Sequence, residues 1–428
     1  MKVLMFGWEF PPHISGGLGT ACYGLSKGLL HNDVEVLFVV PKMFGDEPGG
    51  NIRLINASEV VVNIHDQSYQ DLWRKLTIIG VHSFLRPYLS PDEYTRISHF
   101  AKLNRTEMHE SVFQSHFEFS GKYGPNLFKE VARYAVIAAQ VAASNEFDVI
   151  HAHDWLTFPA GMAAREISGK PLVVHVHATE FDRSGENINQ EVYDMERQGM
   201  HAADKIITVS NFTRNIVINR YGIAPEKVMT VHNAVMPLNQ DGETAEKHIR
   251  EKIVTFLGRV TFQKGPDYFV EAAYKVLKKD DNVRFVMAGS GDMLNKMVKR
   301  VAQLRIGSKF HFTGFLQGKE VDEIFGMSDV YVMPSVSEPF GISPLEAMRS
   351  SVPVIISKQS GVAEVLRHAI KVDFWDVDSI ADNIYALLHY EGLPKMFVKH
   401  GKAEVENMKW DDAGRKVKQA YESLVVSN

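Results

Sequence analysis

The chain has 428 residues, more than one ordinary domain holds, which predicts two domains. Hydrophobic residues make up 45% and charged residues 23%, as in globular proteins with a large core, so disordered, collagen-like, coiled-coil and disulfide-scaffold classes are excluded. The formal net charge of −5 gives no overall basic surface, and we therefore expect no nucleic-acid partner.

Cys22 is the single cysteine, which excludes an intramolecular disulfide and a multi-thiolate metal site and favours a reducing compartment. We interpret it as a buried small residue rather than a nucleophile. The apolar run after Met1 is too short for a signal sequence, and the longest apolar stretch, Tyr134 to Ala143, is too short to span a bilayer. These features predict a cytoplasmic protein with no membrane span.

Short β-branched runs alternate with longer amphipathic segments, the pattern of βαβ units and of parallel sheets covered on both faces. Candidate strands of the first half begin at Lys2, Val34, Val60, Phe147, Pro171, Lys205 and Lys227. Candidate strands of the second half begin at Lys252, Val283, Phe310, Val330 and Val352. The sequence predicts an α/β protein with two Rossmann-like domains.

A polar segment over 237–247 is the best candidate for a linker between the domains. We predict a first domain over 1–236, joined by a C-terminal helix at about 412–428, and a second domain over 248–411. Residues 66–132 depart from the alternating rhythm, and we interpret them as an insertion on the first domain.

The residues just after each strand are the candidates for chemistry, because ligands of open parallel sheets bind beyond the carboxyl ends of the strands. Gly16 and Gly17 follow the first strand and open a helix expected over about Thr20 to Leu30. Backbone amides and the helix dipole favour a phosphate there, and a tight turn is the structural alternative.

The sequences HAHDW and HVHATEFDR end two successive strands. We expect the side chains of His151 and His153 to point in opposite directions, and no third ligand pattern is visible, so the sequence predicts no metal site. Asp154 and His177 are candidates to converge on one ligand pocket, and satisfied buried residues are the alternative.

In the second domain, Arg259 directly follows the strand KIVTFLG, and Lys264 comes before a helix that begins at Pro266. Two cations beside a helix N-terminus suit a diphosphate, and a solvated pair of charges is the alternative. Gly289 ends the next strand and allows close approach of a ligand to the backbone.

The segment SEPFGISPLEAM places Glu338 in a loop and Glu346 in a helix started by Pro344. Ionised carboxylates only accept hydrogen bonds and can accept two at once, which suits sugar and ribose hydroxyls. A capping role in the first helical turn is the alternative for Glu346.

These features together resemble the retaining GT-B glycosyltransferases, in particular the glycogen and starch synthase-like group. The resemblance covers nearly the whole chain and rests on the glycine-rich start, HAHDW, His177, the Arg259 and Lys264 pair, and the Glu338 to Glu346 spacing, which occur in that order. The resemblance implies two Rossmann-like domains with parallel sheets that face a central cleft, and a C-terminal helix that crosses back to the first domain. It also implies catalysis without a cofactor or metal.

By this resemblance, Arg259 and Lys264 neutralise the leaving diphosphate, and His177 lies beside the 6-hydroxyl and anomeric centre of the donor sugar. Asp154 is then a polar group on the acceptor side.

The remaining positions also take their roles from the resemblance. Glu338 contacts the donor sugar and Glu346 binds ribose hydroxyls. The donor-binding backbone includes the amides of Phe340, Gly341 and Ile342, and the loop of Gly16 and Gly17 closes on the phosphates.

The activity expected is that of a retaining hexosyltransferase, an α-1,4-glucan synthase that uses ADP-glucose or UDP-glucose. Ile14 occupies a position where bacterial ADP-glucose-dependent synthases usually have lysine. The alternatives are a trehalose-forming or mannosyl transferase, a UDP-sugar 2-epimerase, and a non-catalytic nucleotide-sugar or glycan-binding protein. Expected partners are a nucleotide-sugar donor and an α-glucan or other saccharide acceptor; the oligomeric state stays open.

Overall fold

The computed structural model describes residues 1–14, 16–48, 50–62, 117–121, 123–124, 126–238 and 249–425. The chain divides into two compact units. The first comprises Met1–His232 and Trp410–Asn428, and the second comprises Asn233–Lys409. Most of the expected linker lies outside the described residues, as do positions 66–116 of the expected insertion with its aromatic residues Tyr69, Trp73, Phe84 and Tyr88.

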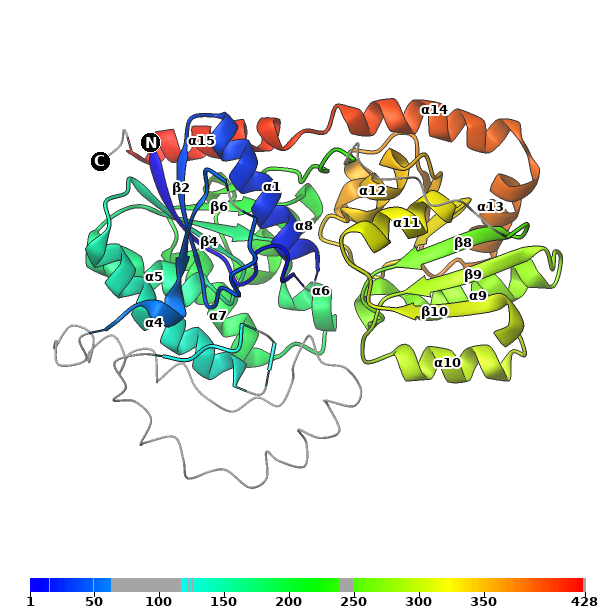
Figure 1. Cartoon of the computed structure of the whole chain (residues 1–428), viewed down its shortest axis with the longest axis horizontal. Coiled ribbons are helices and arrows are strands. Elements are labelled where there is room, and N and C mark those ends of the chain that lie inside the picture. The colour runs from blue at the N-terminus through cyan, green and yellow to red at the C-terminus, as the bar shows by residue number, and fades with distance from the viewer. Residues whose placement is uncertain are drawn as a thin grey trace, which may run out of the picture. The chain divides into compact units, whose positions relative to one another are not determined.

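The first unit contains a sheet of seven parallel strands in the order β3-β2-β1-β4-β5-β6-β7 (Figure 1). The strands are β1 Lys2–Phe6, β2 Glu35–Val40, β3 Arg53–Asn56, β4 Val149–His153, β5 Leu172–Val176, β6 Lys205–Thr208 and β7 Val228–Thr230. The α-helices are α1 Gly17–His31, α4 Leu127–Ser144, α5 Phe158–Ser168, α6 Glu180–Ser184, α7 Gln190–Ala202, α8 Asn211–Tyr221 and α15 Trp410–Val425. Short 3-10 turns are η1 Ala57–Glu59 and η3 Pro225–Lys227.

The strand predicted at Val60 is wrong. Val60 to Val62 lie outside any strand, and the edge of the sheet is β3 instead. An edge strand has a neighbouring strand on one side only and is less buried than a central strand. The four residues of β3 are accordingly partly exposed and lack the continuous apolar run used to find the other strands.

Helices cover both faces of this sheet, with α4, α5 and α7 on one side and α1 and α15 on the other (Figure 1). The central strands β1, β4 and β5 are accordingly buried almost throughout. After Lys2, the strand β1 is a continuous apolar run, whereas β4 and β5 also carry the buried residues His151, His153 and His175.

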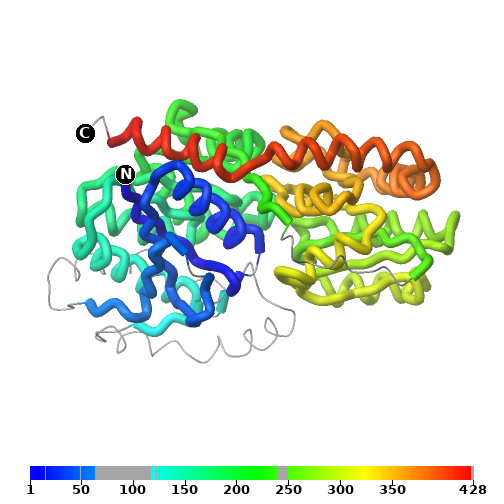
Figure 2. The backbone as a smooth tube through the Cα atoms, turned by 45° about the horizontal axis from the view of Figure 1, so that its top comes forward, coloured from blue at the N-terminus to red at the C-terminus, as the bar shows by residue number. Residues whose placement is uncertain are grey.

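The last helix packs very closely against the first (Figure 2). A Cβ atom added at Gly28 would lie 2.1 Å from the carbonyl oxygen of Trp410, and one at Gly414 would lie 2.4 Å from the backbone of Gly28. The side chains of His31 and Asp411 are 2.8 Å apart at the same crossing. The small residues let the two backbones touch, and the chain's two ends are joined in one unit.

The second unit contains a parallel sheet of six strands in the order β10-β9-β8-β11-β12-β13. The strands are β8 Lys252–Leu257, β9 Val283–Ala288, β10 Phe310–Gly314, β11 Val330–Met333, β12 Val354–Ser357 and β13 Ile370–Val372. The α-helices are α9 Pro266–Leu277, α10 Leu294–Gln303, α11 Lys319–Met327, α12 Ser343–Arg349, α13 Val377–His389 and α14 Gly392–Glu406. Short 3-10 turns are η4 Phe262–Lys264, η5 Gly307–Lys309 and η6 Gly361–Glu364.

The strand β13, three residues long at the edge of this sheet, is not among the predicted strands. Both sheets confirm the predicted fold class of two parallel α/β domains. Of the helices described here, none combines the length and the apolar character that crossing a bilayer requires.

Each sheet has a topological switch point, where the strand order reverses direction. In the first sheet it lies between β1 and β4, and in the second between β8 and β11. Doubly wound sheets bind ligands at this place, beyond the carboxyl ends of the strands. The fold therefore points to the loops after these four strands.

Candidate active site

The predicted residues of the first unit follow β1, β4 and β5. The helix α1 begins at Gly17, three residues earlier than predicted, and Gly16 is its N-cap residue. A Cβ atom added at either glycine would meet no atom within 4 Å, whereas one at Gly19 would lie 2.3 Å from Ile14. Packing therefore requires Gly19, while Gly16 and Gly17 leave open space around backbone amides that an anion could approach.

Asp154 occupies the first position after β4 in the left-handed region, with φ of 61°. Its Oδ1 accepts hydrogen bonds from the backbone N–H groups of His177, at 2.7 Å, and Ala178, at 3.3 Å. The residue is 4% exposed, and burial raises its pKa to about 6. Asp154 thus positions the loop after β5 through hydrogen bonds from that loop's backbone.

His177 is half-buried, and its Nε2 lies 2.9 Å from Nδ1 of His153. Burial lowers the pKa of His177 to about 3, so its ring is neutral at physiological pH. The expectation that His151 and His153 point in opposite directions is wrong. Residues i and i+2 of a strand share a face, and these two rings stack with centroids 4.3 Å apart.

A buried ionic network supports the segment after His177. Arg183 donates to Glu180 at 3.1 Å and also pairs with Glu196, and these side chains are at most 4% exposed. Tyr221 donates to Glu196, whose pKa burial raises to about 7. Glu180 in turn accepts from Ser184 at 2.7 Å. This paired cluster anchors the short helix α6 beside the His177 loop.

The predicted residues of the second unit gather after β8 and β11, on both sides of its switch point. Lys264 forms an ion pair with Glu338, although 74 residues separate them in the chain. Ser335 donates to the same carboxylate oxygen at 3.2 Å, and Glu338 is only 5% exposed. Arg259 donates to Gln263 at 3.3 Å. A carboxylate and two cations thus lie at one edge of the sheet.

The loop that carries Glu338 is tied to η6 and to the segment just before it. The N–H of Glu338 donates to Gln359 at 3.0 Å, and the N–H of Val362 donates to the carbonyl of Phe340 at 2.7 Å. Gly341 has φ of 97°, a conformation that favours glycine, and an added Cβ atom would lie 3.2 Å from the side chain of Glu338. Gly341 therefore shapes the turn, and Ile342 follows it as the N-cap of α12.

Gly289 has a structural reason to be glycine. Its φ is 143°, and an added Cβ atom would lie 1.8 Å from the carbonyl oxygen of Gly258. Its N–H donates to Gly314 at 2.7 Å. Since this amide is already engaged, the geometry of Gly289 serves the packing of the loops after β8, β9 and β10.

Glu346 lies in the first turn of α12 and is half-buried. Burial raises its pKa to about 7; Arg349 opposes this shift, whereas Asp322 reinforces it. Arg349 itself donates to Asp322 at 2.5 Å. The carboxyl of Glu346 therefore changes charge close to neutral pH.

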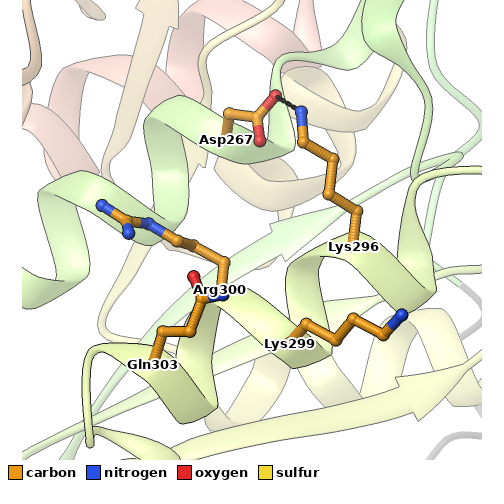
Figure 3. Close-up of a pocket in the computed structure, with 5 residues that line it drawn as sticks. All are labelled: Asp267, Lys296, Lys299, Arg300 and Gln303. Atoms are coloured by element: carbon orange, nitrogen blue, oxygen red, sulfur yellow. Dashed lines mark hydrogen bonds and ion pairs between the residues drawn. The ribbon is translucent and has the colours of Figure 1, made fainter.

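A pocket of about 500 Å³ opens elsewhere on the second unit, between α9 and α10 (Figure 3). Its lining is Asp267, Lys296, Lys299, Arg300 and Gln303. Lys296 pairs with Asp267 at 3.1 Å, as the dashed line marks. None of these five residues belongs to the predicted site. The pocket lies away from the switch point of the sheet, where doubly wound sheets bind their ligands, so we place the candidate site at the switch points.

Three residues that support the site lie outside the predicted set of site residues: His153, Gln263 and Ser335. Each contacts a predicted residue through its side chain. His153 and Gln263 lie within the motifs described above, so their place in those motifs could have indicated them. Ser335 is 0% exposed and lies two residues after β11, so only its position just after a strand could have indicated it.

Comparisons with known proteins agree with this architecture. Residues 241–404 match the model of glycosyl transferases group 1, and residues 112–237 match that of Glycosyltransferase Family 4. A protein of Methanocaldococcus jannaschii described as an uncharacterized glycosyltransferase is 29% identical, with 98% of each chain covered. The glycogen synthase of Mycobacterium tuberculosis is 23% identical over 86% of this chain and 80% of its own.

Among solved structures, HepE of Anabaena in complex with UDP and glucose has a TM-score of 0.66 and 15% identity, with 99% of this chain and 100% of that chain covered. The fold, the two family models and the relatives together place the chain among the glycosyltransferases of the GT-B type.

Proposed function

We propose that the chain is a retaining glucosyltransferase that extends an α-1,4-glucan with glucose from UDP-glucose or ADP-glucose. The observation that carries the proposal is the pair of Lys264 and Glu338, held together at the switch point of the second sheet, with Arg259 in the same segment between β8 and α9 as Lys264. This arrangement offers positive charge for a diphosphate and a carboxylate for sugar hydroxyls.

Negative charge grows on the diphosphate as the bond between the donor's anomeric carbon and the phosphate oxygen breaks. Lys264 and Arg259 lie before the N-terminus of α9, whose dipole adds to their field. Preorganised charges of this kind stabilise the transition state more than the ground state. Ser335 and Lys264 keep Glu338 in place, so that its carboxylate accepts hydrogen bonds from the donor sugar.

His177 acts as a neutral donor of one hydrogen bond to the sugar, because burial lowers its pKa far below physiological pH. Asp154 holds the backbone of this residue, and His153 holds its ring. The acceptor hydroxyl attacks the anomeric carbon on the face that the diphosphate leaves, and its proton passes to the departing phosphate oxygen. The α configuration is retained, and no protein nucleophile is required.

The relatives support the choice of sugar and nucleotide. One relative of similar length is a glycogen synthase, and the solved structure of HepE contains UDP and glucose. The order of HAHDW and His177 in the chain resembles that of glucosyl-transferring members of the fold.

The test is to supply a panel of nucleotide sugars, measure release of nucleoside diphosphate with and without maltooligosaccharides, and digest the products with an α-1,4-specific glucanase. Lengthened chains that the glucanase degrades would support the proposal, and the preferred nucleotide would identify the donor. The Lys264→Ala variant is the control for contaminating enzymes. Transfer to one small acceptor without elongation, or a product with a β linkage, would overturn it.

A further inference from the structure

Four imidazoles lie on one face of β4 and β5, on the side covered by α1 and α15. His151 and His153 belong to β4, and His175 and His177 come from β5 and the position after it. Neighbouring rings have centroids 4.3 to 5.3 Å apart. The first three residues are at most 2% exposed. Glucosyl transfer as proposed above uses only His177 and its support from His153.

Several nitrogens of these four rings have no hydrogen-bond partner in the part of the chain that the structure describes. Nδ1 of His151 lies 2.5 Å from the hydroxyl of Tyr421 in α15, and Nδ1 of His153 lies 2.9 Å from His177. Among the described residues, Nε2 of His151, Nε2 of His153 and both ring nitrogens of His175 have no hydrogen-bond partner. Unsatisfied buried polar atoms are rare because each costs free energy, and a bound ion is one of the recognised explanations.

The three buried rings have the properties of metal ligands. Each ring has at least one nitrogen to which no described residue forms a hydrogen bond, and such a nitrogen can offer its lone pair to a metal ion. One ligand atom from each of the three lies within 4.8 Å of the others. A metal-bound histidine normally uses its second ring nitrogen for an orienting hydrogen bond, as His151 does with Tyr421 and His153 with His177.

We propose that His151, His153 and His175 bind one divalent transition-metal ion of the zinc class. Three imidazoles with an open fourth position are an established ligand set for zinc. The rings are nearly parallel, with interplanar angles of 4 to 26°. The ring of His175, neither of whose nitrogens has a hydrogen-bond partner in the described chain, turns about χ2, a torsion with a broad minimum, to complete the ligand set while the other two rings keep their hydrogen bonds. The ion would join β4 to β5 and, through Tyr421, to the last helix.

A second triad competes for the same ion. Cys22, His153 and His177 also have ligand atoms within 4.8 Å of one another, and the two triads share His153. In the triad of three histidines every ring supplies a buried nitrogen without a hydrogen-bond partner, whereas in the second triad only His153 does so among the described residues. This favours the triad of three histidines.

The experiment measures metal directly, so its outcome is independent of the glucosyltransferase proposal. The full chain, freed of any polyhistidine tag, is stripped with a chelator, loaded with Zn²⁺, dialysed and analysed by mass spectrometry for zinc. We expect about one ion per chain and a higher melting temperature. In His175→Asn, zinc affinity should fall by more than about tenfold. The matched control is His311→Asn, which removes an exposed histidine of β10 and should retain the ion.

Cobalt provides a second measurement, in which the spectrum of the wild-type chain itself reports the ligand set. The Co²⁺-loaded chain should show visible bands of a nitrogen-ligated tetrahedral ion without a thiolate charge-transfer band, and Cys22→Ser should bind equally well. A thiolate band, or loss of the ion in Cys22→Ser, would move it to the second triad and overturn the assignment. Zinc well below one ion per chain, or zinc retained by a folded His175→Asn, would overturn it as well.

Discussion

Lys264 and Arg259 are the residues whose substitution should have the largest effect on the reaction. We expect Lys264→Ala and Arg259→Ala each to lower kcat by about 10²- to 10³-fold and to change the KM for the donor much less, because their charges act on the departing diphosphate. Steady-state kinetics with the preferred nucleotide sugar would measure this.

The surface variant Lys296→Ala is the matched control for these kinetics, since it removes a cation of the α10 pocket that pairs only at the surface. Thermal melts are needed beside the kinetics, because Lys264→Ala leaves the buried carboxylate of Glu338 without its cation. A tenfold higher KM with unchanged kcat would reduce Lys264 and Arg259 to ordinary binding residues.

Glu346 should make donor binding depend on pH. Its pKa is about 7 in the folded chain, so its carboxylate becomes protonated as the pH falls through 7 and accepts fewer hydrogen bonds from the ribose. We expect the KM for the donor to rise from pH 8 to pH 6 in the wild type, and to be high and independent of pH in Glu346→Gln.

Stability should change in the other direction. The folded pKa of Glu346 exceeds the ordinary value of 4.5, so the folded state binds the proton more tightly than the unfolded state does. Its contribution to the free energy of unfolding is full below pH 4.5 and disappears as the pH rises through 7. Urea unfolding of wild type and Glu346→Gln between pH 4.5 and 8 would measure it, and equal pH dependence in the two proteins would contradict the assignment.

At the scale of elements, the crossing of α1 and α15 depends on glycine. Replacing glycine by alanine inside a helix normally stabilises it by about 0.5 to 1 kcal/mol. In Gly28→Ala the new methyl group would lie 2.1 Å from the carbonyl oxygen of Trp410, so we expect destabilisation of about 1 to 3 kcal/mol from overpacking. Urea unfolding would detect it. Gly326→Ala in α11 is the control, because its methyl group would meet no atom within 4 Å. A Gly28→Ala variant as stable as this control would rule out the close crossing.

At the scale of the whole molecule, each unit has a hydrophobic core of its own. We therefore expect two transitions in differential scanning calorimetry of the full chain. Arg259 and Lys264 both belong to the second unit, so UDP or ADP should raise the midpoint of one transition. At about 100 times its dissociation constant, a nucleotide adds about 2.7 kcal/mol to the state that binds it. Arg259→Ala should remove most of this shift, and equal shifts of both transitions would contradict the placement of the nucleotide.

Most strands and helices could be predicted because each depends on the hydrophobic pattern of its own segment. Buried parallel strands need continuous apolar runs, and eleven of the twelve predicted strands correspond to strands of the two sheets. The exceptions have a physical reason. The edge strands β3 and β13 are short and partly exposed, so the hydrophobic pattern that reveals a buried strand is missing from them.

The sequence by itself determined the succession of strands and helices and the motifs at the strand ends, because both depend on neighbouring residues and on hydrophobic period. Tertiary structure alone decided which of these residues meet. The register that sets His153 opposite His175, and the pairing of Lys264 with Glu338 across 74 residues, follow from strand order and loop packing. Such contacts depend on the partner strand as much as on the residue's own segment, so no local pattern carries them.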